Sequence, residues 1–81
     1  MKMTLRRKWT LCNIINKPEI IAISIPSGTY EIEEIPNPFG FEGNWLIIKG
    51  TQIGAPEMAI VKWAQKVFPK YQRDEEIIIN I

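Results

Sequence analysis

Four glutamates form the group of residues that comes closest to a catalytic pattern. Glu31, Glu33 and Glu34 are near neighbours, and Glu42 follows beyond a segment rich in proline and glycine. Two adjacent carboxylates can act as general acid and base, or share a hard cation such as Mg²⁺. Glu31 and Glu33 alternate with apolar residues, however, as on the solvent-facing side of a strand. We therefore expect solvated glutamates at these positions rather than a catalytic pair.

The remaining residues that could carry out chemistry are few. The chain has no histidine, so Ser-His and Cys-His nucleophiles and the commonest metal ligand are absent. The one cysteine, Cys12, cannot form an internal disulfide, and its strand-like surroundings favour a small buried side chain over a reactive thiol. We predict that the protein is not an enzyme and has no catalytic residue, metal site or cofactor. The less favoured alternative is an enzyme that uses Glu31, Glu33 or Asp74.

An aromatic segment runs from Pro36 to Trp45 and also contains Phe39 and Phe41. Its prolines and glycines predict a loop. Aromatic side chains on such a loop can anchor a protein partner or stack on nucleic-acid bases. Alternatively, Phe39 or Phe41 folds back over the end of the core and one aromatic side chain stays exposed. The sequence leaves both interpretations open.

Basic residues fall into two groups, although the net charge is only +1. Arg6 and Arg7 lie near the beginning of the chain, whereas Lys62 and Lys66 share one face of a predicted helix. Side by side, the two groups would form a basic stripe able to bind nucleic acid. Dedicated nucleic-acid domains are usually much more basic than this chain. Ordinary solvated side chains are the favoured interpretation.

The elements that position these residues fit one small domain. We assign residues 1–81 to a single compact domain, with residues 1–7 as the candidate for a flexible basic arm. Both faces of the segment from Glu19 to Ile25 are largely apolar, which predicts a strand covered on both sides. Pro56 suits the first position of a helix. The predicted strands are Lys8–Ile15, Glu19–Ile25, Thr29–Ile35, Asn44–Lys49 and Glu76–Ile81, and the predicted helix is Pro56–Phe68.

These elements follow the order β-β-β-β-α-β and predict an α+β fold. We expect a small, curved antiparallel sheet or barrel of about five strands, with one amphipathic helix over its open side. The strand at Asn44–Lys49 should pair antiparallel with the strand before the aromatic loop. The last strand, with Ile77 and Ile79 on one face, offers an edge to which a partner could add.

The sequence favours a small non-catalytic binding module, an accessory, regulatory or inhibitor protein that acts through protein–protein contacts. Small genomes and mobile elements such as phages encode many proteins of this kind. The predicted partner-binding residues are Phe39, Phe41, Trp45, Ile77 and Ile79.

The alternative is a nucleic-acid-binding small β-barrel, in which a basic arm and a helix face contact phosphates while Phe41 or Trp45 stacks on bases. The phosphate-binding residues would be Arg6, Arg7, Lys62 and Lys66. The longest uncharged run, Ile20–Tyr30, is too short for a membrane-spanning helix. We therefore expect a cytoplasmic protein with no membrane partner, and the sequence leaves a homodimer open.

Overall fold

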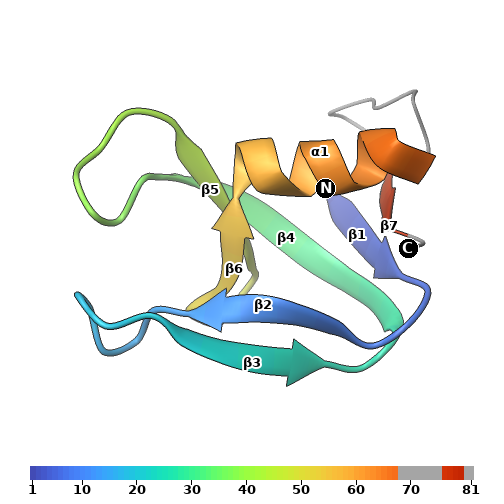
Figure 1. Cartoon of the computed structure of the whole chain (residues 1–81), viewed down its shortest axis with the longest axis horizontal. Coiled ribbons are helices and arrows are strands. Elements are labelled where there is room, and N and C mark those ends of the chain that lie inside the picture. Colours follow the sequence, from blue (N-terminus) through green and yellow to red (C-terminus); the bar gives the residue numbers. More distant parts are fainter. Residues whose placement is uncertain (68–75, 80–81) are drawn as a thin grey trace.

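The computed structural model describes residues 1–67 and 76–79, and the side chains of residues 1–64. Within these residues it shows one open, strongly bent sheet and one helix, which confirms the predicted α+β class (Figure 1). The elements in chain order are β1 (Lys2–Leu5), β2 (Trp9–Asn13), β3 (Ile21–Ile25), β4 (Gly28–Pro36), β5 (Asn44–Ile48), β6 (Ile53–Pro56), α1 (Glu57–Val67) and β7 (Glu76–Ile79).

The sheet has the strand order β3-β2-β6-β5-β4-β1-β7. Neighbouring strands are antiparallel, except that β1 and β7 run parallel. Of the two predicted forms, the structure has the curved sheet and not the closed barrel. β4 and β5 form the predicted antiparallel hairpin, in which Ile32 lies opposite Ile48 and Pro36 opposite Asn44. The aromatic loop therefore joins two strands that are directly paired.

The beginning of the chain is a strand, which corrects the expectation of a flexible basic arm over residues 1–7. Lys2–Leu5 form β1, which lies between β4 and β7. Met3 and Leu5 are each 1% exposed, and the Thr4 hydroxyl lies 2.9 Å from the hydroxyl of Thr29 on β4. The prediction failed because the alternation of Met3 and Leu5 covers only four residues and is followed by a run of positive charge.

A second unpredicted strand, β6, lies between β2 and β5. Its four residues include Gly54 and Pro56, residue types that are depleted in strands. Pro56 closes this strand, and α1 begins at Glu57 rather than at Pro56 as predicted. The predicted helix end at Phe68 lies outside the described residues, as do residues 80–81 of the last predicted strand.

The exposed side chains of β3 contradict the expectation that Glu19–Ile25 is covered on both faces. Ile25 is buried, but Ile21 keeps 44% of its surface exposed, and Ala22 and Ser24 are exposed. Among the described residues, β3 pairs only with β2. A run rich in isoleucine therefore marks an edge strand here, because apolar composition alone does not reveal how many neighbours a strand has.

Helix α1 packs across the sheet with the predicted amphipathic orientation (Figure 1). Ile60 and Ala64 are 0% and 2% exposed, whereas Met58 on the other side is 85% exposed. At the edge of the buried face, Trp63 packs edge-to-face on Trp9 of β2, with ring centroids 5.4 Å apart. The main cluster of buried apolar side chains comprises Met3, Leu5, Leu11, Ile25, Ile32, Leu46, Ala55, Ile60 and Ala64.

Candidate functional site

A groove lies between the β4–β5 loop and the beginning of α1. Its mixed lining combines apolar side chains from the helix with polar and charged groups from both elements. We call it the loop–helix groove. Its lining residues are Asn37, Glu42, Gly43 and Asn44 from the loop side, and Pro56, Glu57, Met58, Val61 and Lys62 from the helix side.

The loop wall of this groove is held in place by its own hydrogen bonds. The Asn37 side-chain oxygen accepts a hydrogen bond from the Phe39 backbone N–H at 2.8 Å, and the Asn37 N–H donates to the Gly43 carbonyl at 3.1 Å. The Asn44 side-chain amide donates to the Glu34 carboxylate on β4. Gly43 has a φ of 96°, which L side chains rarely adopt. The loop is thus a braced structure rather than an unconstrained connection.

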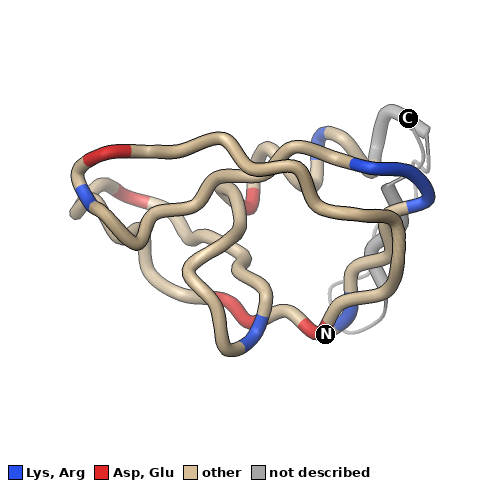
Figure 2. The backbone as a smooth tube through the Cα atoms, turned by 90° about the horizontal axis from the view of Figure 1, so that it is seen from below, with Lys and Arg blue, Asp and Glu red and all other residues tan. Residues whose placement is uncertain are grey.

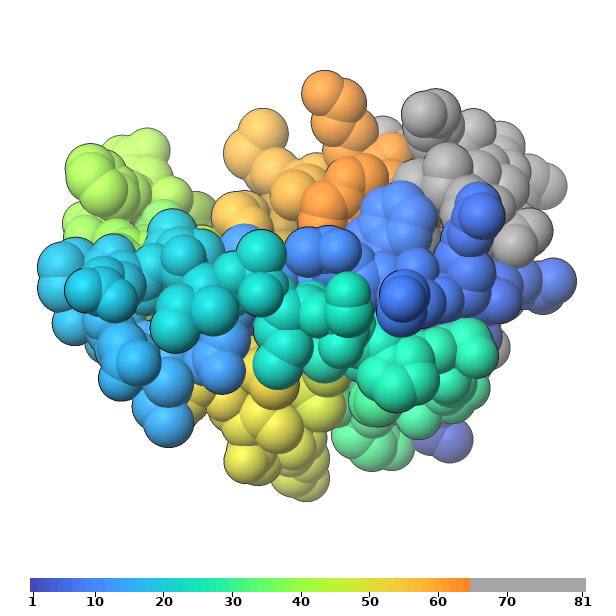
Figure 3. Space-filling model, turned by 60° about the horizontal axis from the view of Figure 1, so that its bottom comes forward, coloured from blue at the N-terminus to red at the C-terminus, as the bar shows by residue number. Residues whose placement is uncertain are grey.

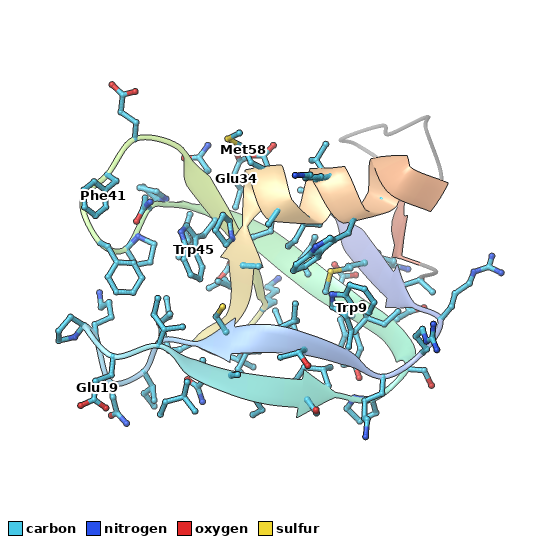
Figure 4. The ribbon with its side chains drawn as sticks, viewed as in Figure 1. Trp9, Glu19, Glu34, Phe41, Trp45 and Met58 are labelled. Atoms are coloured by element: carbon cyan, nitrogen blue, oxygen red, sulfur yellow. The ribbon has the colours of Figure 1, made fainter. Side chains whose placement is uncertain are left out.

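The aromatic residues of the loop divide between the interior and the surface (Figure 4). Trp45 on β5 is 4% exposed, and Phe39 packs on it with ring centroids 5.8 Å apart. Phe41, at the tip of the loop, is 76% exposed. This arrangement fits the second interpretation, in which one phenylalanine folds back over the core and one aromatic side chain stays exposed. The expectation that Trp45 contacts a partner does not fit its buried position, and Trp45 instead anchors the loop to the sheet.

The two most exposed large apolar side chains among the described residues are Met58, which lines the groove, and Phe41, which lies at the tip of the loop and outside the groove lining. Met58 on the first turn of α1 is 85% exposed, and Phe41 is 76% exposed (Figure 4). Carboxylates of Glu42 and Glu57 and the ammonium of Lys62 surround the apolar part of the groove. An apolar centre with a charged rim is the usual composition of a protein-binding surface.

The basic side chains of Arg6, Arg7 and Lys62 are exposed, in line with the favoured interpretation of ordinary solvated residues. Arg6, Arg7 and Lys8 form one exposed stretch between β1 and β2, visible as a continuous basic segment in Figure 2. Lys62, which the less favoured basic stripe would have placed beside them, lines the loop–helix groove. The side chain of Lys66 lies outside the described residues.

A shallow hollow next to this stretch brings basic and aromatic groups together. We call it the basic hollow, and it is lined by Arg7, Lys8, Trp9, Thr10 and Trp63. Trp9 and Trp63 were not among the predicted stacking residues. Each stands next to a lysine in the sequence, and this adjacency is the feature that could have identified them.

The glutamates of β4 do not converge on one point. Glu31 and Glu33 are exposed, as expected for the polar side of a strand, and the Met1 ammonium lies 4.0 Å from the Glu31 carboxylate. Among the described residues, no three Cys, Asp or Glu side chains gather as potential metal ligands. Asp74 lies outside the described residues. Cys12 is half-buried, and burial raises the pKa of its thiol, which lowers the fraction of reactive thiolate.

The predicted partner-binding isoleucines of the last strand lie at the other end of the sheet. In β7, Ile77 is in register with Met3 and Ile79 with Leu5, so the backbone of β7 adds to β1. The side chains of Ile77 and Ile79 are outside the described part of the structure. In the strand order, β1 lies between β7 and β4, and β7 also contacts helix α1.

Comparisons add no relative from which a role could be transferred. No helix within the described residues is long and apolar enough to cross a membrane. Searches of the chain against protein-family models, curated proteins and solved structures found no significant match.

Proposed function

We propose that the protein is a small non-catalytic binding module that contacts a protein partner through the loop–helix groove. As an accessory, regulatory or inhibitor protein, it acts by occupying a surface of that partner. The single observation that supports this function best is the 85% exposure of Met58 in a groove with a braced loop wall, whose loop also carries the 76% exposed Phe41 at its tip. Large exposed side chains on rigid supports bind with little loss of conformational freedom.

The lining of the groove also indicates the chemistry of the partner. Phe41 and Met58 would be covered by an apolar group, and a flexible methionine adapts to irregular apolar shapes. Glu42 favours a basic side chain on the partner, placed at the rim of that contact. We therefore expect a partner surface with an apolar centre flanked by Lys or Arg.

Removing the two exposed anchors should abolish this interaction without unfolding the protein. In a tagged chain, Phe41→Ala with Met58→Ala should reduce the amount of co-purifying partner at least about 10-fold, because central anchors dominate interface energies. Both side chains are exposed, so the free energy of unfolding should change by less than about 0.5 kcal/mol. Co-purified protein is quantified by mass spectrometry, and stability by urea unfolding.

Ile15→Ala is the matched control, because Ile15 is 66% exposed but lies outside the groove. It should leave the captured partner unchanged. Equal capture by the wild type and the double variant would rule out the groove as the contact surface.

The basic hollow supports a second candidate function, binding of single-stranded nucleic acid. Arg7 and Lys8 lie beside the paired rings of Trp9 and Trp63, and basic groups next to aromatic rings are the usual composition of such sites. Here Trp9 and Trp63 take the stacking role that the sequence analysis gave to Phe41 or Trp45. Because Arg7 and Lys8 are exposed, replacing them should not unfold the chain.

Fluorescence polarisation with short single- and double-stranded probes tests this function. Arg7→Ala with Lys8→Ala should weaken binding and reduce the slope of log K against log[salt] by about 1.4 for a single strand, since each phosphate contact contributes about 0.7. Lys17→Ala with Lys49→Ala removes the same charge from two exposed positions outside the hollow and should have little effect. Absence of binding by the wild type at about 50 mM salt would eliminate the candidate.

A further inference from the structure

The outer edge of β3 is an unused hydrogen-bonding surface. β3 is the first strand in the sheet order, and its pairing with β2 runs from Ile25 opposite Trp9 to Ile21 opposite Asn13. Among the described residues, no strand pairs with the other side of β3. An edge strand presents a row of free N–H and C=O groups that can hydrogen-bond to another strand. In Figure 3, the residues of β3 lie across the front of the molecule, open to the viewer.

β3 also lacks the features with which proteins usually protect such an edge. Natural edge strands carry charged side chains, an internal proline or a bulge. The run Ile20–Tyr30 contains no charged residue, and its proline, Pro26, lies beyond the end of β3. Ile20 and Ile21 are 54% and 44% exposed, so the edge is apolar as well as unpaired.

The strand at the other end of the sheet is different in this respect. β7 begins with Glu76, and the sequence immediately before it is Asp74-Glu75. Negative charge at the start of a strand discourages the addition of another strand. Of the two ends of the sheet, β3 is therefore the one suited to pairing between chains.

We propose that β3 pairs antiparallel with β3 of a second copy of the chain, across a two-fold axis. Such pairing joins the two sheets into one continuous sheet, with Ile23 opposite its own copy and Ile21 opposite Ile25. Across a two-fold axis, each residue lies opposite its own copy or opposite a residue close to it in the same strand. A charged residue in the strand could therefore lie opposite a like charge, which would destabilise the contact.

The uncharged sequence of β3 meets this condition for self-pairing. In the register centred on Ile23, even the charged residues before the strand meet uncharged ones, with Glu19 opposite Ser27 and Lys17 opposite Thr29. Exposed Ile21 would gain an apolar neighbour on the same face of the joined sheet. The occupant that fits is thus a second copy of the chain, and an extended segment of another protein is the competing occupant.

Light scattering coupled to size exclusion tests the proposal. At high protein concentration, the wild type should have twice the 9.4 kDa mass of the chain. Ala22→Lys with Ser24→Lys should return the mass to that of one chain. In the register centred on Ile23, each new lysine side chain would lie opposite a lysine of the second copy. A wild type that stays monomeric up to millimolar concentration would overturn the proposal and leave a foreign segment as the occupant of the edge.

A matched control separates an effect at the edge from an effect of charge. Thr10→Lys with Gln52→Lys adds the same two charges at exposed positions that are not on the edge strand. Thr10 lies on β2, directly opposite Ser24 of β3. This control should remain dimeric. Circular dichroism verifies that both lysine variants fold. A folded Ala22→Lys, Ser24→Lys protein that dimerises like the wild type would place the interface elsewhere and refute the proposal.

Spin-label distances provide a measurement that does not depend on disrupting the dimer. In a Cys12→Ser background, a nitroxide is attached at Ser24→Cys or at Thr10→Cys, and its distance to the same label in the second copy is measured. Thr10 is one strand farther from the proposed axis in each copy, while both labels have the same offset along the strands. Because strands are about 4.8 Å apart, the Thr10 distance should be roughly 8 Å longer. Equal distances, or a longer distance for Ser24, would contradict pairing through β3.

Discussion

Replacing Gly54 with alanine is expected to unfold the protein. Gly54 lies in the short strand β6, buried between Cys12 of β2 and Ile47 of β5. A Cβ atom at this position would overlap the Leu46 carbonyl oxygen and lie 2.7 Å from the Ile47 Cα. Both are backbone atoms, so rotation of a side chain cannot relieve the overlap, and β5 and β6 would have to separate. We expect a loss above about 4 kcal/mol, out of a total stability of about 4–12 kcal/mol for a domain of this size.

Urea unfolding followed by circular dichroism measures this effect. The Gly54→Ala protein should show no cooperative transition. Gly40→Ala is the control, because Gly40 has a φ of 82° but no atom within 4 Å of the place that an alanine Cβ would take. Its cost should be only the conformational one, about 1–2 kcal/mol. Cooperative unfolding of Gly54→Ala close to that of the wild type would contradict the packing described for β5 and β6.

Trp45→Ala is expected to have the second largest effect. Trp45 is 4% exposed and carries the packing contact with Phe39, so truncation removes a large buried ring and the anchor of the loop. Loss of a buried tryptophan costs about 3–5 kcal/mol. Because Phe39 belongs to the same loop as the groove wall, partner capture through the loop–helix groove should also fall. Urea unfolding and the capture assay measure the two effects.

Trp45→Phe distinguishes packing from hydrogen bonding at this position. The indole N–H of Trp45 is buried and has no hydrogen-bond acceptor among the described residues. Phenylalanine keeps a ring against Phe39 and removes this unsatisfied donor, so the loss should be well below that of alanine. Phe41→Ala, in contrast, should leave stability unchanged. A Phe41→Ala protein destabilised as strongly as Trp45→Ala would place Phe41 in the core.

The elements predicted correctly are those that stand in the sequence as apolar runs bounded by turn residues, including the five-residue strands β2, β3 and β5. The alternation from Tyr30 onward identified β4, and apolar residues at helical spacing identified α1. β1 and β6 have four residues each, too few to show a period, and β6 includes a glycine and a proline. Gly54 is required in β6 by the close approach of β5, a constraint that exists only in the folded chain.

The candidate site could be predicted only in part. The composition of Pro36–Trp45 identified the loop, but no periodicity indicates which aromatic ring of a loop turns inward. Burial of Trp45 follows from its place on β5, and exposure of Phe41 from its place at the tip of the loop. Met58 is exposed on the first turn of α1, yet its position in the groove depends on how α1 packs on the sheet. The groove joins residues of the loop with residues of the helix, and only the tertiary structure brings these two segments together.

The parallel pairing of β1 with β7 has a consequence for synthesis of the chain on the ribosome. β1 is made first and β7 last, and Lys2 finds its neighbour Glu76 only after most of the chain has been translated. A nascent chain can form the β1–β4 ladder early, but one side of β1 has no neighbour until the codon for Ile79 has been read and that residue has left the exit tunnel. Contacts this distant in sequence slow folding. Ribosome pausing shortly before β7 should therefore extend the period in which chaperones bind the emerging polypeptide.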